Sequence, residues 1–286
     1  MTTTPRPHEP AVPEEAAIDP LIVAVRGDIR LIELGQPFFT GMPCSPNHPG
    51  FRMTLARRHG DMVRADGGSA ANEIIVTGGH VGTHIDALSH VSQDGALHGG
   101  VDAQEAQRGG RFSAHGAEHL PGMLRRGVLL DIARVHETDT LPGGYEITVD
   151  DLEAAARQAR VQVTAGDVAL IRTGWSRLFD EPGAYLGQET GVPGIGVDAA
   201  RWLADHEVSA TGSDTTAYEC IAPGAGHSIL PVHRVLLVES GIYIMEHLAL
   251  EDLADAGISE FAFLLAPLRI VGGTGSPIRP LAAVSR

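Results

Sequence analysis

The sequence predicts a mixed α/β fold, because short apolar runs alternate with segments of helical pattern along most of the chain. Roughly eight or more runs are typical of strands, and at least about three segments are typical of helices. Hydrophobic residues make up 43% of the 286 residues, which is ample for a buried core. At this length the chain could hold one large domain or two small ones. The proline and glutamate content of residues 1–20 indicates a flexible tail.

The expected elements follow one another at regular intervals. Residues 21–34 are the first apolar segment, residues 72–77 are a β-branched strand, and the unbroken apolar run at 127–133 is a buried strand. A helix is expected after Thr148, which can cap its first turn. The remaining elements are a strand at 167–175, a helix at 198–205, strands at 208–215 and 242–245, and two strands between 261 and 284.

The residues that can carry chemistry gather in the stretch GGHVGTHIDALSH, which holds His80, His84, Asp86 and His90. Imidazole nitrogen and carboxylate oxygen are ligands that suit zinc, manganese or iron. A straight strand would place His80 and Asp86 roughly 20 Å apart, and a regular helix would turn Asp86 away from the histidines. We therefore expect a bent strand-to-helix loop that pivots at Gly82.

A catalytic metal site explains this spacing better than the alternatives. Two histidines four residues apart are often only surface or packing residues, but Asp86, His90 and the Gly-Thr insert make the pattern more specific. A structural zinc site normally has four ligands, often cysteines, and no cysteine lies near this stretch. Three ligands with an open position are typical of a catalytic site.

The string HVGTHIDALSH closely resembles the His-x-Gly-Thr-His-x-Asp-x-x-x-His signature of the metal-dependent cyclase family of hydrolases, which includes kynurenine formamidases and isatin hydrolases. Leu88 stands where many members carry proline, and the resemblance runs from about Ile32 to Val284. It implies a single domain over residues 21–286, with a partly open β-barrel or swivelling β/β/α arrangement. It also implies a homodimer or homotetramer.

The resemblance implies the metal ligands as well. His80, His84 and Asp86 would hold a divalent metal, and the downstream His233 and Glu246 would complete a centre for one or two ions per subunit. Imidazole and carboxylate suit both zinc and manganese, and zinc is the preferred expectation. His227 and His247 are close neighbours of this downstream pair and rank lower as ligands.

Three aromatic residues are candidates for the substrate pocket. Phe38 and Phe39 belong to an N-terminal loop that, in the resembling family, helps build the pocket, often that of a neighbouring subunit. Packing of this loop onto its own body is the simpler alternative. Trp175 ends a predicted strand, where it could border the site or close the core.

The expected ligand set predicts hydrolysis of a carbonyl compound. A bound metal would lower the pKa of water toward about 7 and polarise the carbonyl oxygen. His90 lies just beyond the ligands and would act as general acid and base, or else serve as a further ligand. The expected substrate is a small aromatic metabolite with an amide-type carbonyl. The resemblance suggests arylformamidase action on N-formylkynurenine, in tryptophan catabolism, with hydrolysis of a cyclic amide such as isatin, or of a lactone, as the alternative.

Composition argues against several other functions. A net charge of −15 disfavours nucleic acid and anionic membrane surfaces as partners, and no apolar run approaches the length of a membrane span. The N-terminus does not resemble a signal peptide and there are only two cysteines, which together indicate a reduced, cytoplasmic setting. Gly194, Gly196 and Ala199 imitate a dinucleotide fingerprint, but no hydrophobic strand precedes them. A non-catalytic metal- or ligand-binding protein remains the alternative of another class.

Overall fold

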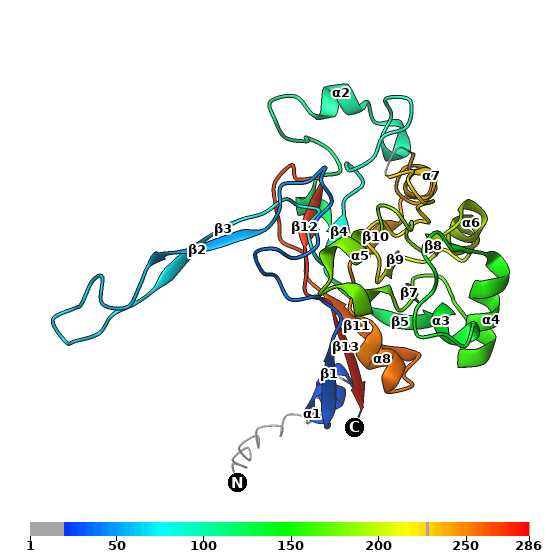
Figure 1. Ribbon diagram of the computed structural model, residues 1–286, viewed down its shortest axis with the longest axis horizontal. Helices are drawn as coiled ribbons and strands as arrows, with labels where there is room; N and C mark the ends of the chain where they lie inside the picture. The colour runs from blue at the N-terminus through cyan, green and yellow to red at the C-terminus, as the bar shows by residue number, and fades with distance from the viewer. Residues whose placement is uncertain (1–19, 227–228, 286) are drawn as a thin grey trace, which may run out of the picture.

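The computed structural model describes residues 20–226 and 229–285. Most of the expected N-terminal tail, and His227, lie outside the described residues. The described chain forms a curled nine-stranded sheet, in the order β1-β13-β11-β5-β7-β9-β10-β4-β12, with helices packed against it (Figure 1). The predicted mixed α/β class is therefore confirmed, and the expected partly open barrel is present as a half-barrel.

The nine strands of this sheet differ widely in length. They are β1 (Ile29–Glu33), β4 (His84–Asp86), β5 (Met123–Asp131), β7 (Val168–Arg172), β9 (Ala210–Ser213), β10 (Tyr243–Glu246), β11 (Glu260–Leu265), β12 (Gly275–Pro277) and β13 (Leu281–Ser285). The four central strands β5, β7, β9 and β10 run parallel to one another. All other pairs of neighbours in this sheet are antiparallel.

The helices are short, and the longest is α4. They are α1 (Pro20–Arg26), α2 (Ala103–Ala106), α3 (Ile132–Val135), α4 (Val149–Ala159), α5 (Pro182–Leu186), α6 (Val197–Asp205), α7 (Pro231–His233) and α8 (Glu251–Asp255). The expected cap of α4 is confirmed, since the Thr148 side chain accepts a hydrogen bond from the Asp151 amide, and the Asp151 carboxylate accepts one from the Thr148 amide. No helix in the described residues is long and apolar enough to cross a membrane.

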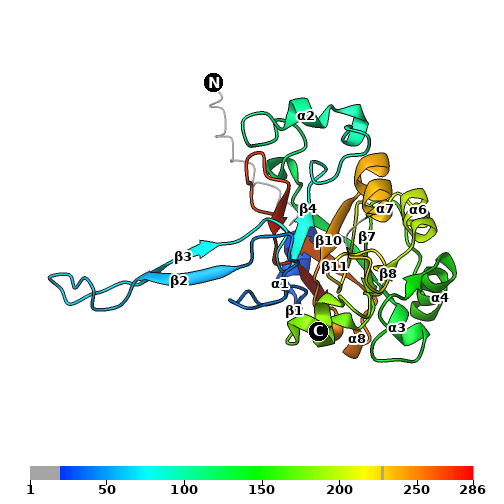
Figure 2. The same ribbon diagram turned by 45° about the horizontal axis from the view of Figure 1, so that its top comes forward.

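The alternation of side chains along the central strands creates two apolar cores. On β5, Val128 and Leu130 point toward one core with the buried faces of α4 and α6, and Leu129 points to the opposite core. On β7, Ile171 and Leu170 divide in the same way. Figures 1 and 2 show α3, α4, α6 and α7 gathered on one side of the sheet.

Two further pairs of strands lie outside the main sheet. β6 (Glu146–Ile147) pairs with β8 (Gly194–Ile195), close to α4 and α6. β2 (Arg52–Arg57) pairs with β3 (Asn72–Val76) in a hairpin that projects far from the body in both views (Figures 1 and 2). The predicted strand at 72–77 is therefore confirmed, but it belongs to this projecting hairpin.

A buried ion pair ties the central sheet to α8. Arg172, at the end of β7, donates to Asp131 Oδ1 (2.8 Å) and, through two nitrogens, to both carboxylate oxygens of Glu251 (3.1 and 2.8 Å). Arg172 is 5% exposed, so its charged group is largely withdrawn from water. Its loss would leave the Asp131 carboxylate without this counter-charge and would leave Glu251 with Arg177 as its remaining cation.

We expect Arg172→Met to lower the free energy of unfolding by about 3–5 kcal/mol, because breaking a buried ion pair leaves an uncompensated charge. Arg177→Met is the control, since Arg177 contacts the same Glu251 at 2.6 Å from an exposed position and should cost less than about 1 kcal/mol. Urea denaturation of both variants measures the difference. Equal losses of unfolding free energy in the two variants would contradict the conclusion that burial makes the Arg172 ion pair the more important one.

Candidate metal centre

The candidate centre is built on the antiparallel pairing of β4 with β10. This pairing sets His84 directly opposite Glu246, and Met245 opposite Ile85. Because side chains alternate along a strand, His84 and Asp86 share one face of β4, and Ile85 points into the apolar core on the other. His84 and Asp86 are both buried, with 2% and 0% exposure. Two of the expected ligands are therefore fixed by regular backbone hydrogen bonding.

The loop before β4 bends sharply at Gly82, as expected. Gly82 has φ +63°, and a Cβ there would lie 2.4 Å from Met42 Cε and 2.8 Å from Phe38 Cζ, so a larger residue would clash as well as strain the backbone. The bend returns His80 toward the strand, where its Nδ1 lies 2.7 Å from Asp86 Oδ1. This local contact is possible because the chain is not extended between the two residues.

The expectation of a helix after this bend was wrong. His84, Ile85 and Asp86 form β4, and the chain then makes a turn in which the His90 amide donates to the Ala87 carbonyl at 2.9 Å. The first helical turn after the motif begins only at His98. Pairing with β10 and β12 on either side stabilises a strand here, and such long-range pairing is not visible in the local sequence pattern.

The downstream pair meets the motif around Asp86. His233, at the end of α7, has its Nε2 3.6 Å from Asp86 Oδ2 and 3.2 Å from Glu246 Oε1. His84 Nε2 lies 3.5 Å from Asp86 Oδ1 and 3.6 Å from Glu246 Oε2. The two histidines thus point their Nε2 atoms at the same pair of carboxylates. The structure therefore brings together all five residues named as ligands.

His90 lies against this group from the side. Its ring stacks on the ring of His80, with centroids 3.8 Å apart and planes 24° apart, and ligand atoms of Asp86, His90 and His233 lie within 4.8 Å of one another. Burial, and to a smaller degree the neighbouring histidines, lowers the pKa of His90 to about 3, against the opposing charge of Asp86. The His90 ring is therefore neutral near pH 7.

The charges of the cluster suit a divalent cation. Burial alone would raise the pKa of Asp86, but the neighbouring histidines, His90 and His80 foremost, hold it well below its usual range. Burial would lower the pKa of His233, but hydrogen bonds to Glu219 and Glu246 raise it to about 10. Asp86 Oδ2 is buried and has no hydrogen-bond partner among the described residues. Buried carboxylates and an orphaned oxygen among imidazoles form a donor set that zinc or manganese fits.

The structure also reveals neighbours of the cluster that the sequence analysis missed. Glu219 accepts a hydrogen bond from His233 Nδ1 at 2.6 Å and from the backbone amides of His233 and Val232. Thr274 Oγ1 lies 2.8 Å from His80 Nε2. Neither residue belongs to a recognisable motif. Each lies beside the cluster because folding brings distant parts of the sequence together.

Two further histidines border the cluster. His247 was ranked low, yet its ligand atom, one of His84 and one of Glu246 lie within 4.8 Å of one another. The His48 ring lies 5.5 Å from the His80 ring, and burial is the main cause that lowers its pKa. The centre is therefore richer in imidazole than the motif alone indicates.

The three aromatic pocket candidates occupy different environments. Trp175 is 5% exposed and donates its indole N–H to the Tyr185 carbonyl at 2.7 Å, so it closes a small apolar core. Phe38 packs on Gly82 inside the same region. Phe39 is 39% exposed and lies edge-on to Phe179, whose ring is 6.4 Å from that of His247. Of the three, Phe39 is the one exposed near the cluster.

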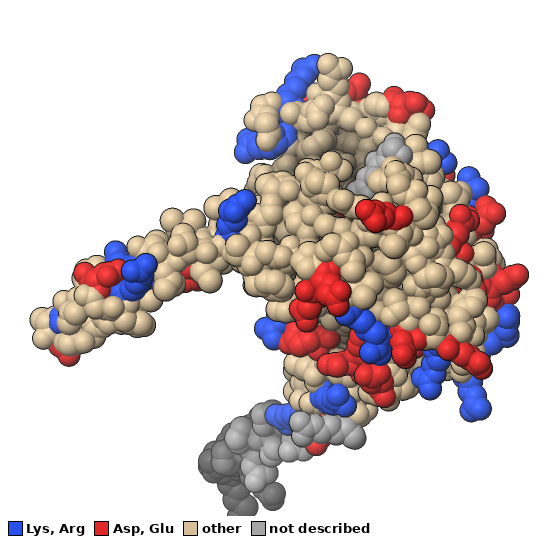
Figure 3. All heavy atoms as spheres, in the orientation of Figure 1, with Lys and Arg blue, Asp and Glu red and all other residues tan. Residues whose placement is uncertain are grey.

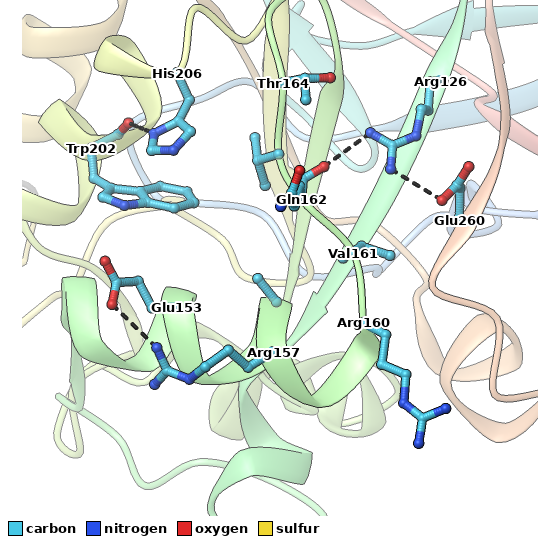
Figure 4. Close-up of a pocket in the computed structure, with 12 residues that line it drawn as sticks. Arg126, Glu153, Arg157, Arg160, Val161, Gln162, Thr164, Trp202, His206 and Glu260 are labelled. Atoms are coloured by element: carbon cyan, nitrogen blue, oxygen red, sulfur yellow. Dashed lines mark hydrogen bonds and ion pairs between the residues drawn. The ribbon is translucent and has the colours of Figure 1, made fainter.

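A hollow of about 1130 Å³ lies away from this centre (Figure 4). It is lined by residues of α4, α6 and β5, and its arginines are engaged in part with carboxylates, as Arg157 is with Glu153 and Arg126 with Glu260. None of its lining residues belongs to the histidine cluster. Size alone is therefore a poor guide to the site in this protein.

A smaller hollow of about 340 Å³ is lined in part by chain neighbours of residues that border the cluster. Its lining includes Asn47, next to His48, and Thr216, next to Thr215, whose carbonyl accepts a hydrogen bond from the His247 amide at 2.9 Å. Its volume lies within the range of about 300–1,000 Å³ that is usual for small-molecule sites. This hollow is the better candidate for the substrate.

We expect Glu219→Gln to weaken metal affinity by about 10–100-fold, because the carboxylate that orients His233 and favours protonation of its Nδ1 would be lost. Metal content after dialysis against a graded chelator, measured by mass spectrometry, tests this. Glu153→Gln, an exposed change on α4, is the control and should match the wild type. Unchanged affinity in Glu219→Gln would contradict a supporting role.

Comparison with known proteins places this geometry in a family. The family model described as "Putative cyclase" matches residues 32–220. An isatin hydrolase of Roseibium aggregatum is 26% identical over 226 residues, which are 78% of each chain. The crystal structure of a novel cyclase is 29% identical with a TM-score of 0.80 and covers 93% of each chain. Isatin hydrolase A from Ralstonia solanacearum is 24% identical with a TM-score of 0.73, covering 96% of this chain and all of its own.

The two structures share the half-barrel fold with this protein, and the matched family segment contains the whole histidine motif and Glu219. Because that segment is more than half of the chain, the protein belongs to the cyclase family.

Proposed function

We propose that this protein is a metal-dependent hydrolase that cleaves an amide C–N bond of a small aromatic metabolite. The observation that carries the proposal is the convergence of Asp86 with four further candidate ligands, His80, His84, His233 and Glu246, in one buried cluster. The similarity to an isatin hydrolase favours a cyclic amide of the isatin type as the substrate. Zinc is the preferred metal and manganese the alternative.

The metal would polarise the substrate carbonyl and make a bound water acidic near neutral pH. The protein's own residues prepare this chemistry. Asp86 presents one oxygen toward His84 and the other toward His233, so it is positioned between two sets of donors and can serve one ion or two. Glu219 fixes the His233 ring with Nδ1 protonated, which leaves Nε2 free to coordinate.

His90 is the proposed general base and acid. Ligand atoms of His90, Asp86 and His233 lie within 4.8 Å of one another, so the His90 ring is within reach of the centre of the cluster. A neutral imidazole there would accept a proton from the attacking water and deliver it to the departing nitrogen. The stacking of His90 on His80 holds the ring in place for both transfers.

The substrate would lie in the 340 Å³ hollow, whose lining includes Asn47 and Thr216. Isatin and aryl formamides are both small, flat molecules that carry a carbonyl bonded to nitrogen on an aromatic ring. Arylformamidase activity is therefore the second candidate, and the location of His233 and Glu246 next to Asp86 favours it, since formamidase members of the family carry this downstream pair. A small molecule is the only partner this chemistry requires.

The cytoplasmic setting remains part of the proposal. Cys44 and Cys220 are both unpaired thiols, which agrees with a reducing compartment.

The first test is hydrolysis of isatin and of N-formylkynurenine by purified protein, with and without prior removal of metal by a chelator. We expect turnover of one of them at about 10⁴ M⁻¹s⁻¹ or more in kcat/KM, lost on chelation and restored by zinc or manganese. Turnover that survives complete metal removal would contradict the proposal. Failure of both substrates with metal-loaded protein would reject both substrate classes.

We expect His90→Ala to keep its metal content and to lose kcat by about 10²–10⁴-fold, the usual contribution of a general acid-base residue. The readouts are metal analysis and steady-state kinetics on the same preparation. His119→Ala is the control, because His119 is exposed and is not one of the candidate ligands. Loss of metal from the His90 variant would instead identify His90 as a ligand.

A further inference from the structure

His247 is a buried histidine beside the cluster to which the proposed mechanism gives no role. It follows Glu246 directly in the chain and is 3% exposed. One ligand atom each of His247, His84 and Glu246 lie within 4.8 Å of one another. This group of three donors includes neither Asp86 nor His233, so it is distinct from the group that those two residues form with their neighbours.

The two carboxylate oxygens of Glu246 face different histidines. Oε1 lies 3.2 Å from His233 Nε2, and Oε2 lies 3.6 Å from His84 Nε2. His84 Nδ1 lies 2.7 Å from the Gly82 carbonyl oxygen, to which it can only donate, so a neutral His84 presents the lone pair of Nε2 toward Glu246. The side of the centre formed by His84 and Glu246 therefore offers one nitrogen and one oxygen donor, and the His247 ring adds a third donor.

A left-handed backbone conformation brings the side chains of Glu246 and His247 together. In a continuous strand, two consecutive side chains would point to opposite faces of the sheet. β10 ends at Glu246, however, and His247 has φ +56°, a conformation that costs a non-glycine residue about 1–3 kcal/mol. Both side chains consequently have a ligand atom close to His84. Residues in such conformations gather at functional sites, which favours a functional role for this ring.

Hydrogen bonds from two other segments hold the backbone of His247. Its amide donates to the Thr215 carbonyl at 2.9 Å, and its carbonyl accepts a hydrogen bond from Thr83 Oγ1 at 2.6 Å. Thr83 is buried and directly precedes His84 in the motif. The motif therefore fixes the position of His247 as well as presenting His84, and the two rings are held with their centroids 5.8 Å apart.

Aromatic side chains lie against the His247 ring. The centroid of the Tyr185 ring is 5.3 Å away, and that of the Phe179 ring is 6.4 Å away. Tyr185 is itself held in place, since its hydroxyl donates to the Asp214 carbonyl at 3.0 Å. Such surroundings restrict rotation of the imidazole and limit the access of water, as the apolar shell of a metal site does.

The charge of the protein favours a cation at this position. Acidic residues outnumber basic ones by 36 to 21, and Figure 3 shows groups of acidic side chains over the body. A negative potential raises the local concentration of cations. A neutral imidazole beside the Glu246 carboxylate adds a donor of the type that suits zinc, whereas manganese is better suited by carboxylate and water.

We propose that His247 is a further metal ligand, which holds a divalent ion together with His84 and Glu246 and favours zinc over manganese there. This inference rests on the proposed function, in which the cluster binds such an ion.

The test measures the affinities of the metal-free protein for Zn²⁺ and for Mn²⁺, each by competition with a chelator. Asparagine tolerates the left-handed conformation, so His247→Asn removes the imidazole and keeps the backbone. Loss of a residue that only supports a ligand weakens metal affinity about 10–100-fold, so loss of a ligand should lower Zn²⁺ affinity about 100-fold or more. Mn²⁺ affinity should fall less, because manganese gains less from imidazole.

His115→Asn is the matched control, since His115 also has a left-handed backbone, with φ +58°, and is not one of the clustered donors. It should keep both affinities. Unchanged affinities in His247→Asn, or an equal loss of both, would overturn the proposal and leave the proposed function intact. A wild type that binds neither metal would reject both.

A second measurement uses the wild type and does not depend on the folding of a variant. Crystals of the zinc-loaded protein, measured at the zinc absorption edge, should show an ion about 2.0–2.1 Å from a His247 ring nitrogen. Zinc that is bound by His84 or Glu246 but not by His247 would also overturn the proposal.

Discussion

The pairing of β4 with β10 is the constraint on which the centre depends. It sets His84 against Glu246 at the edge of the parallel core and leaves Asp86 between His84 and His233. Carboxylates this deeply buried need a nearby positive charge, because desolvation otherwise favours their neutral forms. The surrounding imidazoles supply that charge when they are protonated, and a divalent cation would supply it more compactly. The half-barrel therefore holds together buried donors whose charge a divalent cation would balance.

Much of the fold and the centre could be predicted from the sequence, for identifiable reasons. The strands near 127–133 and 167–175 are unbroken apolar runs, since both of their faces are buried. The helix after Thr148 is capped by residues adjacent in the sequence, Thr148 and Asp151, so its start is visible in the local pattern. The motif ligands lie within a few residues of one another, so their spacing carries the information. Family resemblance then added His233 and Glu246, which no spacing rule would have found.

The remaining features depend on long-range contacts, which leave no local pattern. Glu219 reaches His233 across fourteen positions of sequence and Thr274 reaches His80 across 194, so neither stood out beforehand. The segment after Gly82 became a strand because β10 and β12 pair with it, which outweighed the local expectation of a helix. The exposure of the strand at 72–77 was equally invisible, because a β-branched sequence predicts a strand but does not predict which surface packs against it.

The hairpin of residues 52–76 and the centre are joined directly along the chain. β3 ends at Val76, only four residues before His80, and the link between them is anchored where the Gly78 amide donates to the Pro49 carbonyl at 3.0 Å. Just before β2, Phe51 lies edge-on to Phe38, which packs on Gly82. Both ends of the hairpin thus join the loop that carries His80. A histidine held in place loses less entropy on metal coordination than one that must be ordered, so these anchors favour coordination by His80.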